Sequence, residues 1–306
     1  MTNSGWSRTE SPFHAGELTI QARLGIQEQM DRQGRRMIRE YLTEQHQQFF
    51  TQLSYLIIGT VDVSGNPWSS IVVGEPGFIR AINNKKLQIN TQILTGDPLT
   101  FTLKEGIDIG LLGIELHTRR RNRVNGIITK IDVDSLEIEV QQTFGNCPQY
   151  IQPRTFIPNQ LNNSPRIEKL TFLTKWEKDL IANGDTFFIA TAYQDQSQSI
   201  SKGVDVSHRG GNPGFIRIDN NQTLTIPDFS GNNHFNTIGN LESNPRAGLL
   251  FIDFADNNLL YLTCTTEIIW LGAEVRAFAG AQRLIRVHLK QGYRVKNSLP
   301  ISWSVS

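Results

Sequence analysis

The sequence contains only two cysteines, Cys147 and Cys264, which are too few for a disulfide framework. It also lacks an apolar run near the roughly 18 residues that a membrane-spanning helix needs. These two shortages predict a reduced, cytoplasmic protein without a membrane partner. The six histidines show no metal-ligand spacing, and the fingerprints Gly-x-Gly-x-x-Gly and Gly-x-x-x-x-Gly-Lys are missing. We therefore expect no metal site, no thiol nucleophile, and neither a Rossmann nor a P-loop nucleotide site.

An excess of charge of one sign is missing as well. The 30 basic and 29 acidic side chains leave a net charge of +1, so no strong overall field attracts the chain to nucleic acid. We expect no nucleic-acid partner. The length of 306 residues predicts two domains of ordinary size. Residues 1–12 are polar without the apolar core of a secretion signal, and we interpret them as an arm.

One segment of the sequence is repeated later in the chain. Residues 76–90 reappear at 213–227, an offset of 213 − 76 = 137, and both copies begin with Pro-Gly-Phe-Ile-Arg. A second match, at an offset of 138, relates the Gly-Leu-Leu that starts at Gly110 to the one that starts at Gly248. Two matches in the same order, with one residue inserted between them in the later copy, indicate an internal duplication.

Each copy combines a short helical segment with closely spaced strands. Apolar residues at three-to-four spacing predict helices between 17 and 53, with Gly34 separating two of them, and a further helix over 173–182. Short apolar runs between turn residues predict one set of strands from 55 to 142 and a second from 186 to 291, the pattern of small antiparallel barrels. The predicted fold class is mainly β with short helices (α+β), arranged as two tandem barrels.

The same patterns predict four regions along the chain. They are an N-terminal arm with helices at 1–53, a first barrel at 54–144, a connector at 145–166 and a second barrel at 167–306. The connector is expected to be extended and not helical because it is rich in proline and asparagine: Pro148, Pro153, Pro158, Pro165, Asn159, Asn162 and Asn163.

The copies differ most after two equivalent serines, Ser70 and Ser207. Apolar residues follow Ser70, whereas Ser207 is followed by donors and glycines: His208, Arg209, Gly210 and Gly211. Hydroxyl, imidazole, guanidinium and glycine amide groups can together cradle a phosphate. A polar hairpin corner is the structural alternative.

A second polar segment of the later copy runs from Asp228 to Asn240. It is dense in amide groups, among them Asn232 and Asn233, and it opens a predicted helical turn near 236–242. The N-terminus of a helix attracts phosphate through its free N–H groups. Capping and turn chemistry is the structural alternative.

The earlier copy has its own cluster of charge. Four arginines fall within five residues, at Arg119, Arg120, Arg121 and Arg123, whereas the matching stretch near 259–267 has none. Such a cluster is either a solvated loop or strand, or it holds the phosphate or carboxylate of a ligand. If the barrels pack with pseudo-twofold symmetry, one composite site draws on both copies.

Several motifs recur together in one known family. In the earlier half they are Pro12-Phe13-His14-x-Gly16-Glu17, Asp62-x-x-Gly65-x-Pro67-Trp68, Pro76-Gly77-Phe78, the run from Arg119 to Gly126, and Phe144-Gly145-Asn146-Cys147-Pro148-x-Tyr150-Ile151. In the later half they are Ser207-His208-Arg209-Gly210-Gly211-x-Pro213-Gly214-Phe215, Gly231-Asn232, Gly239-Asn240, the run from Ala247 to Asp253, and Leu299-Pro300-x-x-Trp303. With these motifs nearly the whole chain resembles the pyridoxamine 5'-phosphate oxidase-related, FMN-binding split-barrel proteins, in their double-barrel, FMN-dependent flavoprotein branch.

The resemblance implies two tandem split β-barrels with FMN at their interface. Phosphate contacts are expected from Ser207, His208 and Arg209. Further cofactor contacts are expected from Gly210, Asn232, Asn233, Asn240, Arg121 and Arg123. The lysine with which the oxidase binds phosphate has no counterpart here, and no catalytic residue is predicted.

The first functional interpretation is an FMN-dependent oxidoreductase that uses a small-molecule substrate or a separate electron donor. The second is a non-catalytic protein that binds flavin, another phosphorylated ligand or a tetrapyrrole. The third is a protein-binding scaffold. A monomer and a homodimer are both compatible with the sequence.

Overall fold

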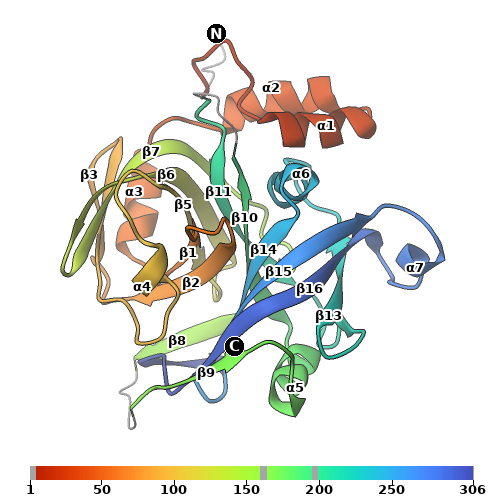
Figure 1. Ribbon diagram of the computed structural model, residues 1–306. Coiled ribbons are helices and arrows are strands. Elements are labelled where there is room, and N and C mark those ends of the chain that lie inside the picture. Colours follow the sequence, from red (N-terminus) through yellow and green to blue (C-terminus); the bar gives the residue numbers. More distant parts are fainter. Residues whose placement is uncertain (1–4, 159–163, 195–198, 306) are drawn as a thin grey trace.

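The computed structural model describes residues 5–158, 164–194 and 199–305, which form two large antiparallel sheets, one from each half of the chain (Figure 1). The elements of the first half are α1 (Ala15–Arg23), α2 (Gln27–Met37), α3 (Glu44–Thr51), β1 (Tyr55–Val61), β2 (Pro67–Val73), β3 (Ile79–Asn83), β4 (Lys86–Asn90), α4 (Leu99–Thr102), β5 (Asp108–Glu115), β6 (Arg120–Asp132) and β7 (Ser135–Gly145). Those that follow are β8 (Arg154–Pro158), β9 (Arg166–Leu170), α5 (Lys175–Asn183), β10 (Thr186–Tyr193), β11 (Gly203–Gly210), β12 (Arg217–Ile218), β13 (Thr223–Phe229), α6 (Asn236–Ser243), β14 (Arg246–Ile252), β15 (Leu259–Ile269), α7 (Ala273–Arg276), β16 (Ala281–Lys296) and β17 (Ile301–Val305). The fold is mainly β with short helices, as the sequence predicts.

The two sheets have the same strand order. The order β2-β1-β5-β6-β7-β4-β3 of the first sheet corresponds strand for strand to β11-β10-β14-β15-β16-β13-β12 of the second. The register agrees as well, because Ile58 pairs with Ser70 and Ile189 pairs with Ser207. The internal duplication is thus confirmed at the level of residue pairs, and Ser70 and Ser207 are equivalent. Among the described strands, pairing leaves both sheets open.

The halves touch along strands that carry glycine. A Cβ added to Gly110 in β5 would lie 2.5 Å from the Val204 carbonyl oxygen in β11. A Cβ added to Gly248 in β14 would lie 2.4 Å from the Pro67 carbonyl oxygen in β2. These reciprocal contacts are those of a pseudo-twofold axis, and they hold the backbones too close for any side chain.

A buried apolar cluster fills the interface around these glycines. Because its members come from both halves, it joins the two sheets into one body. They include Tyr55, Ile57, Trp68, Ile71, Leu112, Phe188, Val206, Leu250 and Tyr261.

Three helices precede β1, and the predicted break at Gly34 is wrong. Gly34 lies inside α2, where an added Cβ would lie 2.5 Å from the ring of Phe13. This glycine serves close packing and not a turn. The helical region is interrupted instead at Gly25, which has a φ of 70°, and again between α2 and α3. No helix among the described residues is long and apolar enough to cross a membrane.

The described part of the connector contains no helix, and its backbone turns at Tyr150, which has a φ of 63°. Its strand β8 pairs with β17 near the end of the chain, which was not predicted. The connector residues Asn159, Asn162 and Asn163 lie outside the described residues, as do positions 1–4 of the arm. The sequence also failed to predict β11, because a strand with Asp, Ser, His and Arg side chains gives no apolar run.

The close approach of the two halves predicts a large penalty for a side chain at Gly110. Replacing Gly110 by Ala places a methyl group against a backbone oxygen, which cannot move as a side-chain tip can. We expect the free energy of unfolding to fall by about 1–3 kcal/mol, measured by urea denaturation. Gly231→Ala is the matched control, because an added Cβ there meets no atom within 4 Å. Equal stability of the two variants would contradict this account of the interface.

Candidate functional site

A cleft opens where β6 of the first half meets β11 of the second. Its walls come from β6, from residues 146–150 after β7, from β11, and from residues 227–238 between β13 and α6. The cavity volume is about 130 Å³ without the open mouth of the cleft. Eight of the nine predicted site residues line it: Arg121, Arg123, Ser207, His208, Arg209, Gly210, Asn232 and Asn233.

Arg123 crosses from the first half into the second. Its Nη1 donates to Asp205 Oδ1 at 2.9 Å, and its Nη2 donates to Ser207 Oγ at 2.6 Å. Asn125 also donates to Asp205 Oδ1, at 2.9 Å. The side chain of Arg123 is only 4% exposed, and burial lowers its pKa although Asp205 opposes this. A buried, hydrogen-bonded ion pair thus joins the halves at the cleft.

Arg121 lies two residues earlier on the same strand and also lines the cleft. Its Nε donates to the Cys147 carbonyl oxygen at 2.7 Å, and its Nη1 lies 3.4 Å from His208 Nδ1. Burial, followed by the charge of Arg123, lowers the pKa of Arg121 to about 10. Burial and the charge of Arg121 hold the pKa of His208 well below its ordinary value. The imidazole is therefore neutral at pH 7, and its Nε2 has no hydrogen-bond partner among the residues that the structure describes.

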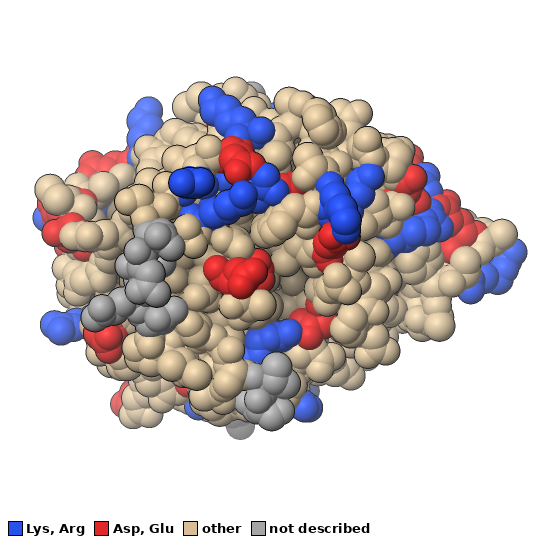
Figure 2. All heavy atoms as spheres, turned by 90° about the horizontal axis from the view of Figure 1, so that it is seen from below, with Lys and Arg blue, Asp and Glu red and all other residues tan. Residues whose placement is uncertain are grey.

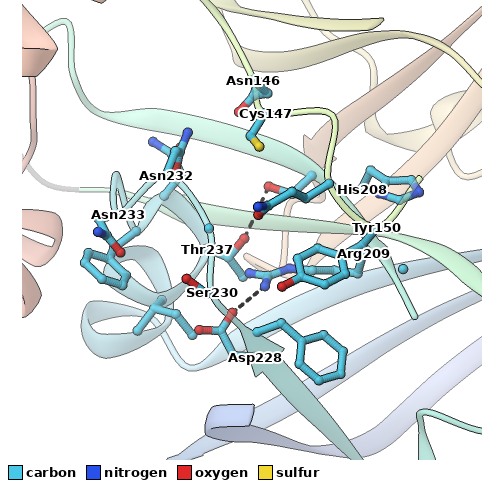
Figure 3. A pocket seen from close by; sticks show the side chains of 18 of the residues that line it. Asn146, Cys147, Tyr150, His208, Arg209, Asp228, Ser230, Asn232, Asn233 and Thr237 are labelled. Carbon is cyan, nitrogen blue, oxygen red and sulfur yellow. Dashed lines mark hydrogen bonds and ion pairs between the residues drawn. The ribbon is translucent and has the colours of Figure 1, made fainter. Parts of the chain in front are cut away.

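Arg209 reaches the cleft from β11 and pairs with Asp228, as Figure 3 shows. Arg283 lies on the other side of the same carboxylate, with its Nε 3.3 Å from Asp228 Oδ2. No described residue forms a hydrogen bond with the Nε of Arg209. Asp228 therefore fixes one side of the guanidinium and leaves one donor unused.

The start of α6 forms the remaining wall. Phe235 caps the helix with a φ of 64°, and Asn236 and Thr237 follow it along the cleft. Thr237 Oγ1 donates to Ser207 Oγ at 3.2 Å, so two hydroxyl groups lie together beside Arg123.

The predicted cofactor contact of Asn240 is not supported, because Asn240 does not line the cleft. Its Nδ2 donates to Thr191 Oγ1 at 3.0 Å and to Asp205 Oδ2 at 2.9 Å, and the side chain is fully buried. Asn240 supports Asp205 from behind and thereby helps to fix Arg123.

The wall made by residues 146–150 was not predicted as part of the site. Its sequence has no match at the offsets of 137 and 138, so the repeat gives no signal for it. Its backbone packs on β11 so closely that a Cβ on Gly210 would lie 2.1 Å from the Tyr150 carbonyl oxygen. The ring of Tyr150 stacks on Phe229, with ring centroids 5.3 Å apart.

Asp228 was also missed, although the repeat held a signal for it. At the offset of 137, Thr91 stands in the earlier copy where the later copy has Asp228. A carboxylate that appears at the end of a repeated strand, beside newly acquired arginines, indicates an ion pair in that copy alone.

In the first half, side chains fill the position that corresponds to the cleft. Arg123 is equivalent to Tyr261, because the two pair with the equivalent residues Leu112 and Leu250. The Tyr261 hydroxyl donates to Asp97 Oδ2 at 2.8 Å. Ser70, the equivalent of Ser207, donates to the other oxygen of Asp97. These polar groups satisfy one another, whereas donors on the cleft side do not.

Trp68 completes this closure. At the offset of 137 it occupies the position of Asp205, and its side chain is fully buried. Its indole nitrogen donates to Asp62 at 3.0 Å. An aromatic ring thus stands in the first half where the second half has a carboxylate that pairs with Arg123.

The charges of the cleft favour an anion. Three arginines and one aspartate line it, which gives 3 − 1 = +2. Asp205 and Arg283 lie behind these residues and cancel each other. The excess is local, because basic and acidic side chains are interspersed over the face of the molecule shown in Figure 2. A dianionic phosphate group has the charge and the acceptor oxygens that this set of donors matches.

The comparisons with known proteins give only partial likenesses. No protein-family model and no curated protein matches the sequence. Among solved structures, HupZ of Group A Streptococcus is 19% identical over 38% of this chain and 89% of its own, with a TM-score of 0.31. A candidate pyridoxamine 5'-phosphate oxidase from Lactobacillus delbrueckii is 14% identical over 44% of this chain and 98% of its own, with a TM-score of 0.32.

A third solved structure, an FAD-binding protein from Mesorhizobium loti, is 9% identical over 42% of this chain and 97% of its own, with a TM-score of 0.27. Each of these three proteins corresponds to less than half of the chain. At such identities and scores they support no statement about what this chain binds, and the function is argued from the cleft alone.

A buried histidine behind the cleft predicts a loss of stability in acid. His234 is fully buried between the rings of Phe13 and Phe144, and neither ring nitrogen has a hydrogen-bond partner in residues 5–158, 164–194 and 199–305. Burial, followed by the charge of Arg123, lowers its pKa from 6.5 to about 4. Because the unfolded chain takes up this proton first, stability is lost as the pH falls from 6.5 towards 4.

We expect His234→Leu to remove this dependence. As the pH falls, the free energy of unfolding of the variant should rise relative to that of the wild type, by up to about 3 kcal/mol near pH 4. This follows because the pKa of His234 is lowered by 6.5 − 4 = 2.5, and a pKa difference of 1 corresponds to about 1.36 kcal/mol. Urea denaturation at several pH values between 7.5 and 4 measures the difference. A difference that does not change with pH would contradict the assignment of a neutral, buried His234.

Proposed function

We propose that the chain binds FMN in the cleft and acts as an FMN-dependent oxidoreductase. The observation that carries the proposal is the set of donors from both halves, which surrounds one position with a net charge of +2. Arg121 and Arg123 come from β6, whereas Ser207, His208 and Arg209 come from β11. In this proposal the FMN phosphate lies among them.

Unpartnered buried donors support an anionic ligand. Within the described part of the chain, the Nε of Arg123 and the Nε2 of His208 have no hydrogen-bond partner, and both residues are at least 95% buried. Leaving such groups unpaired costs about 1–3 kcal/mol each. Phosphate oxygens within reach of these groups would remove part of that cost, and the neutral His208 ring can donate a hydrogen bond from one nitrogen.

The apolar side of the cleft suits the ring system of a flavin. Aromatic side chains line it from three segments, with Tyr150 stacked on Phe229 and with Phe215 and Phe235 nearby in the lining. In this arrangement the polar cluster holds the phosphate, and the aromatic wall orients the rings and excludes water from them. When bound, FMN supplies the electron or hydride transfer. The chain's own residues bind and orient it, and turnover requires a small-molecule substrate or a separate electron donor.

The first test is the colour of the protein. The purified protein is incubated with FMN and freed of excess cofactor. We expect it to absorb near 450 nm. We also expect this absorbance to be bleached by a reduced nicotinamide, or by a donor protein that a chemical reductant keeps reduced. If the protein is yellow but no donor bleaches it, it binds flavin but is not an FMN-dependent oxidoreductase. Protein that stays colourless would overturn the proposal.

Arg121 should contribute strongly to FMN affinity. In Arg121→Gln we expect the Kd for FMN to rise about 10–100-fold, because a charge-assisted hydrogen bond contributes about 1.5–3 kcal/mol. Quenching of flavin fluorescence measures the Kd. Arg119→Gln is the matched control, because Arg119 lies in the same arginine cluster but is exposed and does not line the cleft. If both variants bind as the wild type does, Arg121 does not hold the phosphate.

The closed position in the first half predicts one flavin per chain. Trp68 and Tyr261 occupy the space that corresponds to the cleft, and the polar groups there are paired with each other. A titration of the protein with FMN should therefore saturate at about 1 equivalent per chain, measured by flavin absorbance against protein concentration. Saturation near 2 equivalents would show that the first half also binds.

A further inference from the structure

Cys147 is a thiol in the cleft for which FMN binding gives no role. It lines the cleft, its residue is half-buried, and its sulfur points into the cleft in Figure 3. The second cysteine, Cys264, is fully buried in β15, and burial raises its pKa to about 12. Cys147 is therefore the accessible thiol, and Cys264 serves as an inaccessible thiol for comparison.

Two hydrogen bonds hold the backbone around Cys147 beside Arg121. The Cys147 carbonyl oxygen accepts from the side-chain Nε of Arg121 at 2.7 Å, and the Asn146 N–H donates to the Arg121 carbonyl oxygen at 3.2 Å. Pro148 follows and restricts the backbone further. The backbone of Cys147 is therefore held beside the guanidinium of Arg121.

The side chains around this thiol are positively charged. Arg121, whose pKa is lowered to about 10 by burial and by the charge of Arg123, contacts the Cys147 backbone. Arg209 and Arg123 line the same cleft. Cysteines beside arginine or histidine in partly exposed, positive surroundings are typical reactive thiols.

Two buried groups of the cleft favour an anion in the space that contains this thiol. His208 is 5% exposed and Arg123 is 4% exposed, and among the described residues each has one nitrogen without a hydrogen-bond partner. Both line the cleft that also contains Cys147. An anion held by these groups shares the cleft with Cys147, and the positive charge of the cleft raises the local concentration of anionic reagents.

We propose that Cys147 is a reactive thiol that is selectively modified by small anionic electrophiles, in competition with any anion bound in the cleft. This replaces the expectation, drawn from the sequence alone, that the chain has no nucleophilic thiol. With iodoacetate as the probe, the thiol first loses its proton to solvent. The thiolate sulfur then attacks the methylene carbon, the S–C bond forms as the C–I bond breaks, and iodide leaves. The proposal rests on the cleft and not on FMN.

The test compares a negative and a neutral alkylating agent on the same protein. Labelling by iodoacetate and by iodoacetamide is followed by intact-protein and peptide mass spectrometry, with glutathione as the free reference thiol. We expect modification of Cys147 and not of Cys264, and an iodoacetate-to-iodoacetamide rate ratio at least about tenfold above that of glutathione. Inorganic pyrophosphate at millimolar concentration should slow the iodoacetate reaction.

Two variants make the test specific. In Cys147→Ser the label should be lost, and in Arg121→Gln the rate ratio should fall towards that of glutathione, whereas Arg119→Gln should keep the wild-type ratio. A wild-type ratio equal to that of glutathione, or equal labelling of Cys264, would overturn the proposal whether or not the variants fold. A high rate ratio in a protein that does not bind FMN would support the reactivity of Cys147 and contradict only the proposed binding of FMN.

Discussion

The buried contact of Arg123 with Asp205 and Ser207 is the interaction on which the rest of the site depends. A guanidinium this deeply buried is stable only when a carboxylate compensates it and further hydrogen bonds satisfy its donors. Asp205 receives three such donors, since Asn125 and Asn240 also bind it. Because Arg123 belongs to one half and Asp205 to the other, the pair fixes where β6 lies against β11. The position of Arg121 beside His208 follows from that alignment.

The pseudo-twofold relation shows how one fold can produce two different interiors. In both halves a side chain reaches across to a carboxylate of the other half: Arg123 on β6 reaches Asp205, and Tyr261 on β15 reaches Asp97. On the closed side, Tyr261 and Ser70 bind the two oxygens of Asp97, and the ring of Trp68 fills the space. On the cleft side, the carboxylate of Asp205 takes the position of Trp68 and pairs with Arg123. The exchange of a large ring for a carboxylate leaves this side open and lined with polar groups.

The sequence predicted the parts of this structure that depend on repetition. The offsets of 137 and 138 locate equivalent strands, and once Ser70 and Ser207 are aligned, His208 and Arg209 stand out because their counterparts are apolar. It could not predict features that show no sequence match between the copies. The segment that carries Cys147 and Tyr150 packs on β11 through backbone contacts that no pattern of side chains records. The placement of Asn240 behind Asp205 could not be predicted either, because an amide that supports a buried carboxylate has the same sequence appearance as one that binds a ligand.

The arrangement of donors also connects ligand binding to the packing of the two halves. The positive groups of β6 and the hydroxyl and imidazole groups of β11 face one cleft, so an anion between them would form hydrogen bonds to both halves at once. Without an anion, Arg121, Arg123 and Arg209 repel one another, which is one reason why the pKa of Arg121 falls. An anion would reverse the sign of that interaction at the boundary between the halves. Occupation of the cleft and close packing of the sheets therefore stabilise each other, because any ligand that binds only the folded chain shifts the folding equilibrium towards it.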